Sequence, residues 1–162
     1  MQLVKASLNQ KEEIFALILE QSQWIKSLGI NQWPVEWMQS QKIEIFKSVS
    51  EGFFYTCCVD NVLAAVVELR TAPEDIWEYE SSKSLYIHKL AVALAVKGQG
   101  IGRCIIAEIM TWAKAQSCHY LRLDCASGNT KLREYYKSVG FCFVRTRVYN
   151  EFDSALFQLS LD

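Results

Sequence analysis

The stretch Val96-Lys97-Gly98-Gln99-Gly100-Ile101-Gly102-Arg103 places three glycines at alternate positions. The mostly apolar residues 85–92 precede it, and apolar residues at helical spacing follow it, which predicts a strand, a glycine-rich turn and a helix in that order. Such a turn presents backbone N–H groups at the positive end of a helix dipole, where an anion is favoured. The stretch therefore predicts a binding site for phosphate or pyrophosphate.

The composition is that of one ordinary globular domain, with 162 residues, 51% of them hydrophobic and 22% charged. The formal net charge is -1, whereas nucleic-acid binding needs a basic face, so we expect no nucleic-acid partner. No uncharged apolar run is long enough to span a membrane, and the first residues lack the pattern of a signal peptide. We therefore expect a cytoplasmic protein without a membrane partner.

The six cysteines predict free thiols, because a chain without a secretory signal is expected in a reducing compartment. Cys57 and Cys58 are adjacent, and no C-x-x-C pair occurs, although zinc sites commonly use that spacing. We therefore expect no metal ion.

Apolar periodicity predicts alternating strands and helices along the whole chain. The first helix, over 9–28, presents an apolar face that includes Leu28, and Gly29 is its stop signal. A second helix carries Met38, Ile45, Phe46 and Val49 as its stripe, and Asp60-Asn61 predicts a hairpin between two strands. Residues 71–84 are expected to form a loop. The expected strands are 2–6, 53–59, 62–70, 85–92, 119–125, 141–149 and 155–161, and the later helices are 101–116 and 130–139. The order β-α-α-β-β-β-α-β-α-β-β predicts a mixed sheet covered by helices.

Two common nucleotide motifs do not fit the glycine stretch. A Walker A loop needs lysine and then serine or threonine after its last glycine, but Arg103 and Cys104 follow Gly102. The dinucleotide fingerprint G-x-G-x-x-G would need a glycine at 103 or at 105, and neither is present. Asp124, at the end of the next predicted strand, keeps a Rossmann-type domain as an alternative hypothesis.

Three motifs together resemble the GNAT superfamily of N-acetyltransferases. The resemblance is specific over residues 85–141 and elsewhere follows the order of elements. The family's glycine motif is [RQ]-x-x-G-x-[GA], and lysine replaces the expected arginine or glutamine at its first position. The motifs are Leu90-Ala91-Val92, Lys97-Gly98-Gln99-Gly100-Ile101-Gly102 and Asn129-x-x-Leu132-x-x-Tyr135-Tyr136-x-x-x-Gly140-Phe141.

The resemblance implies an α/β (α+β) fold of three layers, formed by residues 1–162 as a single domain. Its central sheet would be mixed, mostly antiparallel and twisted, with about seven strands and helices on both faces. The implied activity is transfer of an acetyl group from acetyl-CoA, as co-substrate, to a primary amine of a small molecule or peptide by direct attack on the thioester. A non-catalytic acyl-CoA-binding or sensing module on the same fold is the alternative.

The resemblance also implies where coenzyme A binds. The pyrophosphate would lie on backbone N–H groups of 99–103, the pantetheine arm would run along 90–92, and the N–H of Val92 would polarise the thioester carbonyl. Asn129 would hold the pantetheine arm, and its alternative role is a helix N-cap. The expected coenzyme-binding residues are Leu90, Ala91, Val92, Lys97, Gly98, Gln99, Gly100, Ile101, Gly102, Arg103, Asn129 and Tyr136.

Tyr136 is the expected general acid, because the family's acid tyrosine follows the asparagine by seven residues and a phenol can protonate the leaving thiolate. Its alternative role is a core aromatic residue, although the helical pattern favours Tyr135 for the core. The candidates for general base are His88, which is expected to share a strand face with Tyr86, Leu90 and Val92, and Glu68. Their alternative roles are a packed histidine and an edge or surface carboxylate.

The sequence gives little indication of which amine is the acceptor. Trp33, between the first two helices, lies where the family builds its acceptor wall, although it could equally anchor the loop. The acidic segment 74–80 could attract a cationic amine or could be a solvated loop. Exposed edge strands at the C-terminus are compatible with a homodimer.

Overall fold

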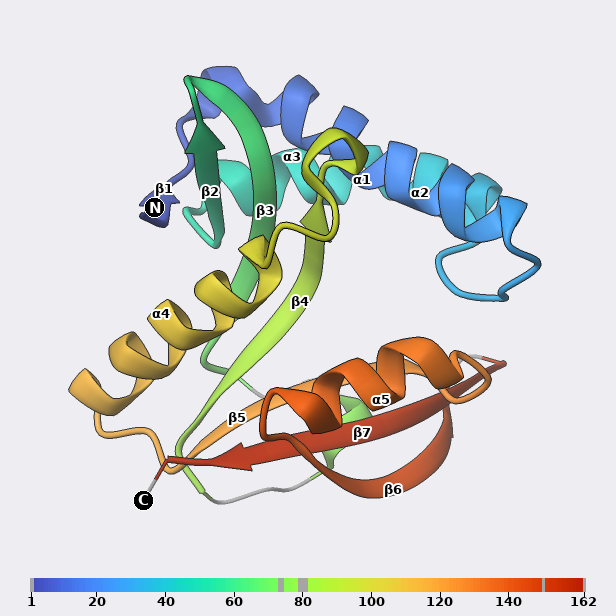
Figure 1. Cartoon of the computed structure of the whole chain (residues 1–162), viewed down its shortest axis with the longest axis vertical. Helices are drawn as coiled ribbons and strands as arrows, with labels where there is room; N and C mark the ends of the chain where they lie inside the picture. Colours follow the sequence, from blue (N-terminus) through green and yellow to red (C-terminus); the bar gives the residue numbers. More distant parts are fainter. Residues whose placement is uncertain (1, 73–74, 79–81, 150, 162) are drawn as a thin grey trace. The chain divides into compact units, whose positions relative to one another are not determined.

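The computed structural model describes residues 2–72, 75–78, 82–149 and 151–161, and contains seven strands and five α-helices (Figure 1). The strands form one sheet in the order β1-β2-β3-β4-β5-β7-β6. Strands β4 and β5 pair in parallel, whereas β1–β2, β2–β3, β5–β7 and β6–β7 pair antiparallel. The predicted mixed sheet of about seven strands is thus confirmed. The strands are Val4–Lys5 (β1), Phe54–Val59 (β2), Val62–Arg70 (β3), Ser84–Val92 (β4), Tyr120–Ala126 (β5), Cys142–Tyr149 (β6) and Phe152–Ser160 (β7); the helices are Lys11–Ser27 (α1), Val35–Ser40 (α2), Lys42–Ser50 (α3), Ile101–Ala115 (α4) and Thr130–Ser138 (α5).

The chain forms two compact units. We call Met1–Leu69 with Lys89–Glu108 the first unit, and Arg70–His88 with Ile109–Asp162 the second unit. Strand β4 and helix α4 each contribute residues to both. No helix in the described part of the chain is both long enough and apolar enough to cross a membrane.

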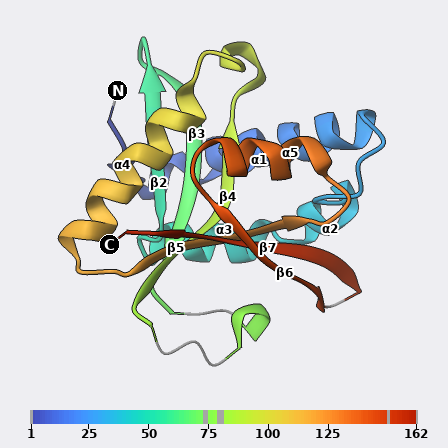
Figure 2. The same ribbon diagram turned by 60° about the horizontal axis from the view of Figure 1, so that its bottom comes forward.

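The first unit is built on β2 and β3, with α1 and α3 on one face of them (Figure 2). Asp60 and Asn61, which join the two strands, have φ angles of 50° and 63°. A two-residue type I′ hairpin requires left-handed backbone at both positions, and asparagine and aspartate tolerate it. The predicted hairpin is therefore confirmed, with Val59 opposite Val62. The core residues are Ile14, Phe15, Leu17, Ile18, Met38, Ile45, Val49, Phe54, Leu63, Val66 and Ala91.

Two predictions for the first unit are wrong in detail. The predicted second helix is two consecutive helices, α2 and α3, which are separated at Gln41. The N–H of Gln41 donates to both Trp37 O and Met38 O. The apolar periodicity continues across Gln41, and residues 35–50 contain no glycine or proline that would mark a helix end. Leu28 is 48% exposed rather than part of the apolar face, because α1 ends at Ser27 and Gly29 has a φ of 70°.

The second unit packs α5 against β7 and β6, and β6 is at one end of the strand order (Figure 1). Strand β7 pairs along its length with β5, from Tyr120 opposite Ser160 to Ala126 opposite Ser154. Trp77, Tyr86 and Leu156 form a fully buried cluster. This corrects the expected loop over 71–84, because Asp75–Trp77 form a 3-10 turn within it and the Trp77 side chain is buried.

Candidate active site

The glycine loop of the first unit joins β4 to α4. Gly98 and Gly100 both have a φ of 80°, and a Cβ built on either would meet no atom within 4 Å. The glycines are therefore required by the left-handed backbone and not by crowding. Helix α4 begins at Ile101, as predicted, and the first N–H groups of any α-helix lack acceptors within the helix. The loop residues 97–100 that precede these donors are exposed.

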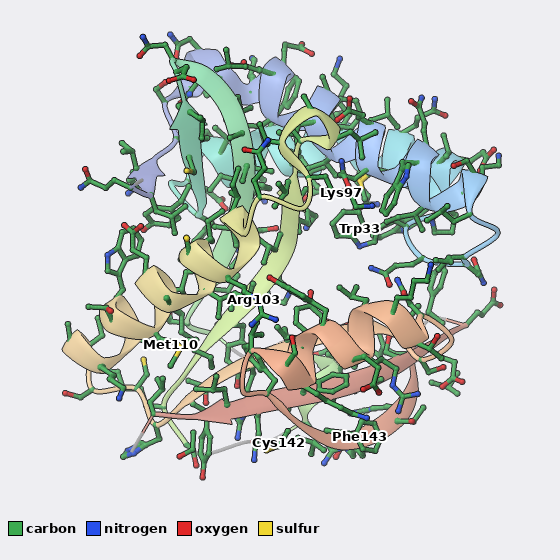
Figure 3. The ribbon with its side chains drawn as sticks, viewed as in Figure 1. Trp33, Lys97, Arg103, Met110, Cys142 and Phe143 are labelled. Atoms are coloured by element: carbon green, nitrogen blue, oxygen red, sulfur yellow. The ribbon has the colours of Figure 1, made fainter. Side chains whose placement is uncertain are left out.

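Lys97, at the start of this loop, lies on an aromatic ring. Its Nζ is 3.0 Å from the centroid of the Trp24 ring of α1, a cation–π contact that no local sequence pattern could predict. Arg103 lies on the first turn of α4 and is also exposed (Figure 3). Two cationic side chains of the first unit thus flank the glycines.

Strand β4 contains a break in its regular backbone at Lys89, which has a φ of 47°. A left-handed residue inside a strand interrupts the alternation of side chains between the two faces. The shared face predicted for His88, Leu90 and Val92 relied on that alternation and no longer follows. Leu90 and Val92 are half-buried, Ala91 is buried, and His88 is half-buried.

Glu68 of β3 is 3% exposed, and its partners in the first unit include Ser48 and Lys89. Ser48 Oγ donates to Oε1 at 2.5 Å, and Lys89 Nζ donates to Oε2 at 2.7 Å. The alternative role as an edge or surface carboxylate is therefore wrong, because the carboxylate is buried and forms an ion pair with the half-buried Lys89 of β4.

Asn129 of the second unit is the N-cap of α5. Its Oδ1 accepts a hydrogen bond from Leu132 N at 3.2 Å, and the residue is buried. This is the alternative role predicted for it, and such a cap is worth about 1 kcal/mol of stability.

Tyr136 lies on the buried side of α5. Its ring centroid is 5.8 Å from that of Phe141 and 6.0 Å from that of Phe157. Burial, with smaller contributions from Cys125, Tyr135 and Asp124, raises the pKa of the Tyr136 phenol above its usual value, so the hydroxyl keeps its proton at neutral pH. Tyr135 is only half-buried, so the expectation that Tyr135 is the core residue of the pair is wrong.

Trp33 has a left-handed backbone, with a φ of 51°. The fully buried Ser22 donates from Oγ to the Trp33 carbonyl at 2.6 Å, and the indole packs against the first-unit core. The predicted role of Trp33 as a loop anchor fits these contacts.

The acidic segment is only partly described, since Glu74, Tyr79 and Glu80 lie outside the described residues. Glu78 forms ion pairs with Arg145 at 3.4 Å and Arg147 at 3.0 Å on β6. The Glu78 carboxylate of the acidic segment is thus already paired within the second unit.

The described residues were also compared with the requirements of a metal site and of a cysteine nucleophile. No group of three or more histidine, cysteine or acidic side chains within them could hold a metal ion. All six cysteines are described and unpaired, and burial raises the pKa of Cys125 to about 12. A thiol with such a pKa is protonated at neutral pH and is a poor nucleophile.

Comparison with known proteins identifies the class. Residues 17–141 match the family model described as acetyltransferase (GNAT) family. An uncharacterized N-acetyltransferase of Bacillus subtilis (strain 168), YesJ, is 31% identical over 144 residues, which cover 82% of this chain and 77% of that protein. The chain therefore belongs to the acetyltransferase (GNAT) family, which makes it an enzyme of the acyltransferase class.

Solved structures share the fold. A GNAT-family acetyltransferase from Streptococcus agalactiae 2603 superposes with a TM-score of 0.84 at 17% identity, covering 98% of this chain and 94% of the other. The PaiA N-acetyltransferase from Thermoplasma acidophilum, solved in complex with coenzyme A, superposes with a TM-score of 0.76 at 15% identity and covers 98% of both chains. At these identities the likeness concerns the fold.

Proposed function

We propose that this protein transfers an acetyl group from acetyl-CoA to a primary amine of a small molecule or peptide, and that residues 1–162 act as one catalytic domain. The observation that carries the proposal is the exposed glycine loop directly before α4, in a chain of the acetyltransferase family. Acetyl-CoA as the co-substrate fits this family, and the Thermoplasma neighbour was crystallised with coenzyme A.

The glycine loop suits a pyrophosphate for a physical reason. Gly98 and Gly100 carry no side chain, and the space that a Cβ would occupy at either position is open. Backbone N–H groups at the start of α4 can therefore approach phosphate oxygens closely, and the positive end of the helix favours their charge. Lys97 and Arg103 add two positive charges to the rim.

Acetyl-CoA supplies an activated acetyl carbonyl, and residues of the chain are proposed to handle the protons and the developing charge. The Val92 N–H donates to the carbonyl oxygen, and Leu90 and Ala91 pair with the pantetheine amides. Asn129 holds the pantetheine arm in addition to capping α5. Tyr136 donates its proton to the sulfur as the carbon–sulfur bond breaks, and the proton that the attacking amine loses passes to a base, for which His88 is the remaining candidate.

Release of the free coenzyme A thiol tests this proposal. The protein is incubated with acetyl-CoA and a panel of amines that includes polyamines, amino sugars and peptides with free N-termini. We expect thiol release that depends on one class of amine, with N-acetylation of that amine in the mass spectrum. Binding of acetyl-CoA without release for any amine would instead support the non-catalytic sensing module.

A further inference from the structure

Lys89 is in an unfavourable backbone conformation for its type. Within the described residues, it is the only residue with a side chain that has a left-handed φ inside a strand, since the others lie in turns and loops. The Cβ of an L-residue crowds the following carbonyl in this conformation. Such a residue persists only where its surroundings hold it in place.

Hydrogen bonds around the buried Glu68 carboxylate, in the first unit, hold Lys89 in place. The Lys89 side chain is 23% exposed, and its Nζ lies 2.7 Å from Oε2 of the buried Glu68. The other carboxylate oxygen of Glu68 accepts from Ser48 Oγ at 2.5 Å. The carboxylate is thus fixed from α3 on one side and fixes the ammonium of β4 on the other.

The segment that follows Lys89 is also fixed at its far end. Ala93 N donates to Ala64 O of β3 at 2.8 Å. Residues 90–92 therefore lie between two anchors to the same strand, namely the Glu68–Lys89 ion pair and this backbone hydrogen bond. The left-handed turn at Lys89 sets the direction in which their N–H groups point, because rotation about one backbone angle redirects every peptide that follows it.

We infer that Glu68 is a positioning residue: through Lys89 it holds the break in β4 and so aims the backbone N–H groups of 90–92 at the thioester arm of acetyl-CoA. The inference rests on the proposed function for its ligand. It departs from a role for Glu68 as general base, which would require a carboxylate open to the attacking amine; this one is 3% exposed and already accepts from two donors.

Lys89→Gly and Lys89→Met form a matched pair that tests the inference. Both remove the ammonium, but glycine adopts the left-handed backbone without strain whereas methionine does not. We expect Lys89→Met and Glu68→Gln to raise the Kd for acetyl-CoA about tenfold, and Lys89→Gly to stay within about threefold of the wild type. Amide hydrogen exchange over 90–92, measured without ligand, should accelerate in the first two variants and remain slow in the third.

The double variant Glu68→Gln/Lys89→Gly guards against misfolding, because it leaves no unpaired buried charge. It should also bind acetyl-CoA within about threefold of the wild type. Equal weakening by Lys89→Gly and Lys89→Met, or unchanged binding and exchange in all variants, would overturn the inference. A fall in kcat with unchanged KM in Glu68→Gln would overturn it in favour of a base. If wild-type protein fails to bind acetyl-CoA, the proposed function fails, while the exchange measurement still tests the anchor.

Discussion

Tyr136→Phe is expected to lower kcat about 100-fold while leaving the Kd for acetyl-CoA within about threefold. The variant removes one hydroxyl and keeps the ring, so the contacts with Phe141 and Phe157 that hold α5 are preserved. A tyrosine hydroxyl is protonated at neutral pH, and burial raises the pKa of this one further, so it carries a proton but releases it less readily than an exposed phenol. Steady-state turnover and calorimetric binding of acetyl-CoA measure the two quantities separately.

Tyr135→Phe is the matched control for this experiment. Tyr135 is the neighbouring phenol on the same helix, its ring centroid lies 5.6 Å from that of Tyr136, and it is less buried. We expect its turnover to remain close to that of the wild type. Equal turnover in Tyr136→Phe and the wild type, or an equal loss in both variants, would remove the assignment of Tyr136 as the acid.

Gly100→Ala is expected to weaken acetyl-CoA binding about tenfold and to lower the free energy of unfolding by about 1 kcal/mol. The stability cost arises from the left-handed backbone, since a Cβ at this position meets no protein atom within 4 Å. The binding cost has a second cause: the methyl group would project into open space beside the N–H groups proposed to hold the pyrophosphate. Chemical denaturation and calorimetry give the two values.

Gly29→Ala controls for the strain alone. Gly29 has a φ of 70° and equally open surroundings, but it lies at the end of α1 outside the glycine loop. We expect it to lose similar stability and to keep wild-type affinity for acetyl-CoA. If the two alanine variants lost affinity equally, the glycine loop would have no special part in binding.

Much of the fold could be predicted because it depends on local patterns. Runs rich in β-forming residues located β2 and β3, and two residues tolerant of left-handed backbone located the hairpin at Asp60 and Asn61. The glycines located the start of α4 at Ile101, and Asn129 was recognisable as the cap of α5. Each of these features is decided by residues within a few positions of one another.

The unpredicted features depend on residues far apart in the chain. Glu68 and Lys89 are 21 positions apart, and a lysine gives no local sign that it will adopt left-handed backbone. Trp24 and Lys97 meet only because α1 packs beside the loop before α4. Tyr136 is buried more deeply than Tyr135, and its ring packs against Phe157 of β7, which is distant in the chain. Tertiary packing decides these features, and local propensity does not.

Thermal unfolding of the wild-type protein with acetyl-CoA, and separately with NAD, tests the proposed use of acetyl-CoA most directly. A ligand present at about 100 times its Kd stabilises the folded state by about 2.7 kcal/mol, which for a domain of this size raises Tm by about 5 °C or more. We expect that rise with acetyl-CoA and none with NAD. An unchanged Tm with acetyl-CoA at millimolar concentration, or a rise with NAD alone, would contradict the account.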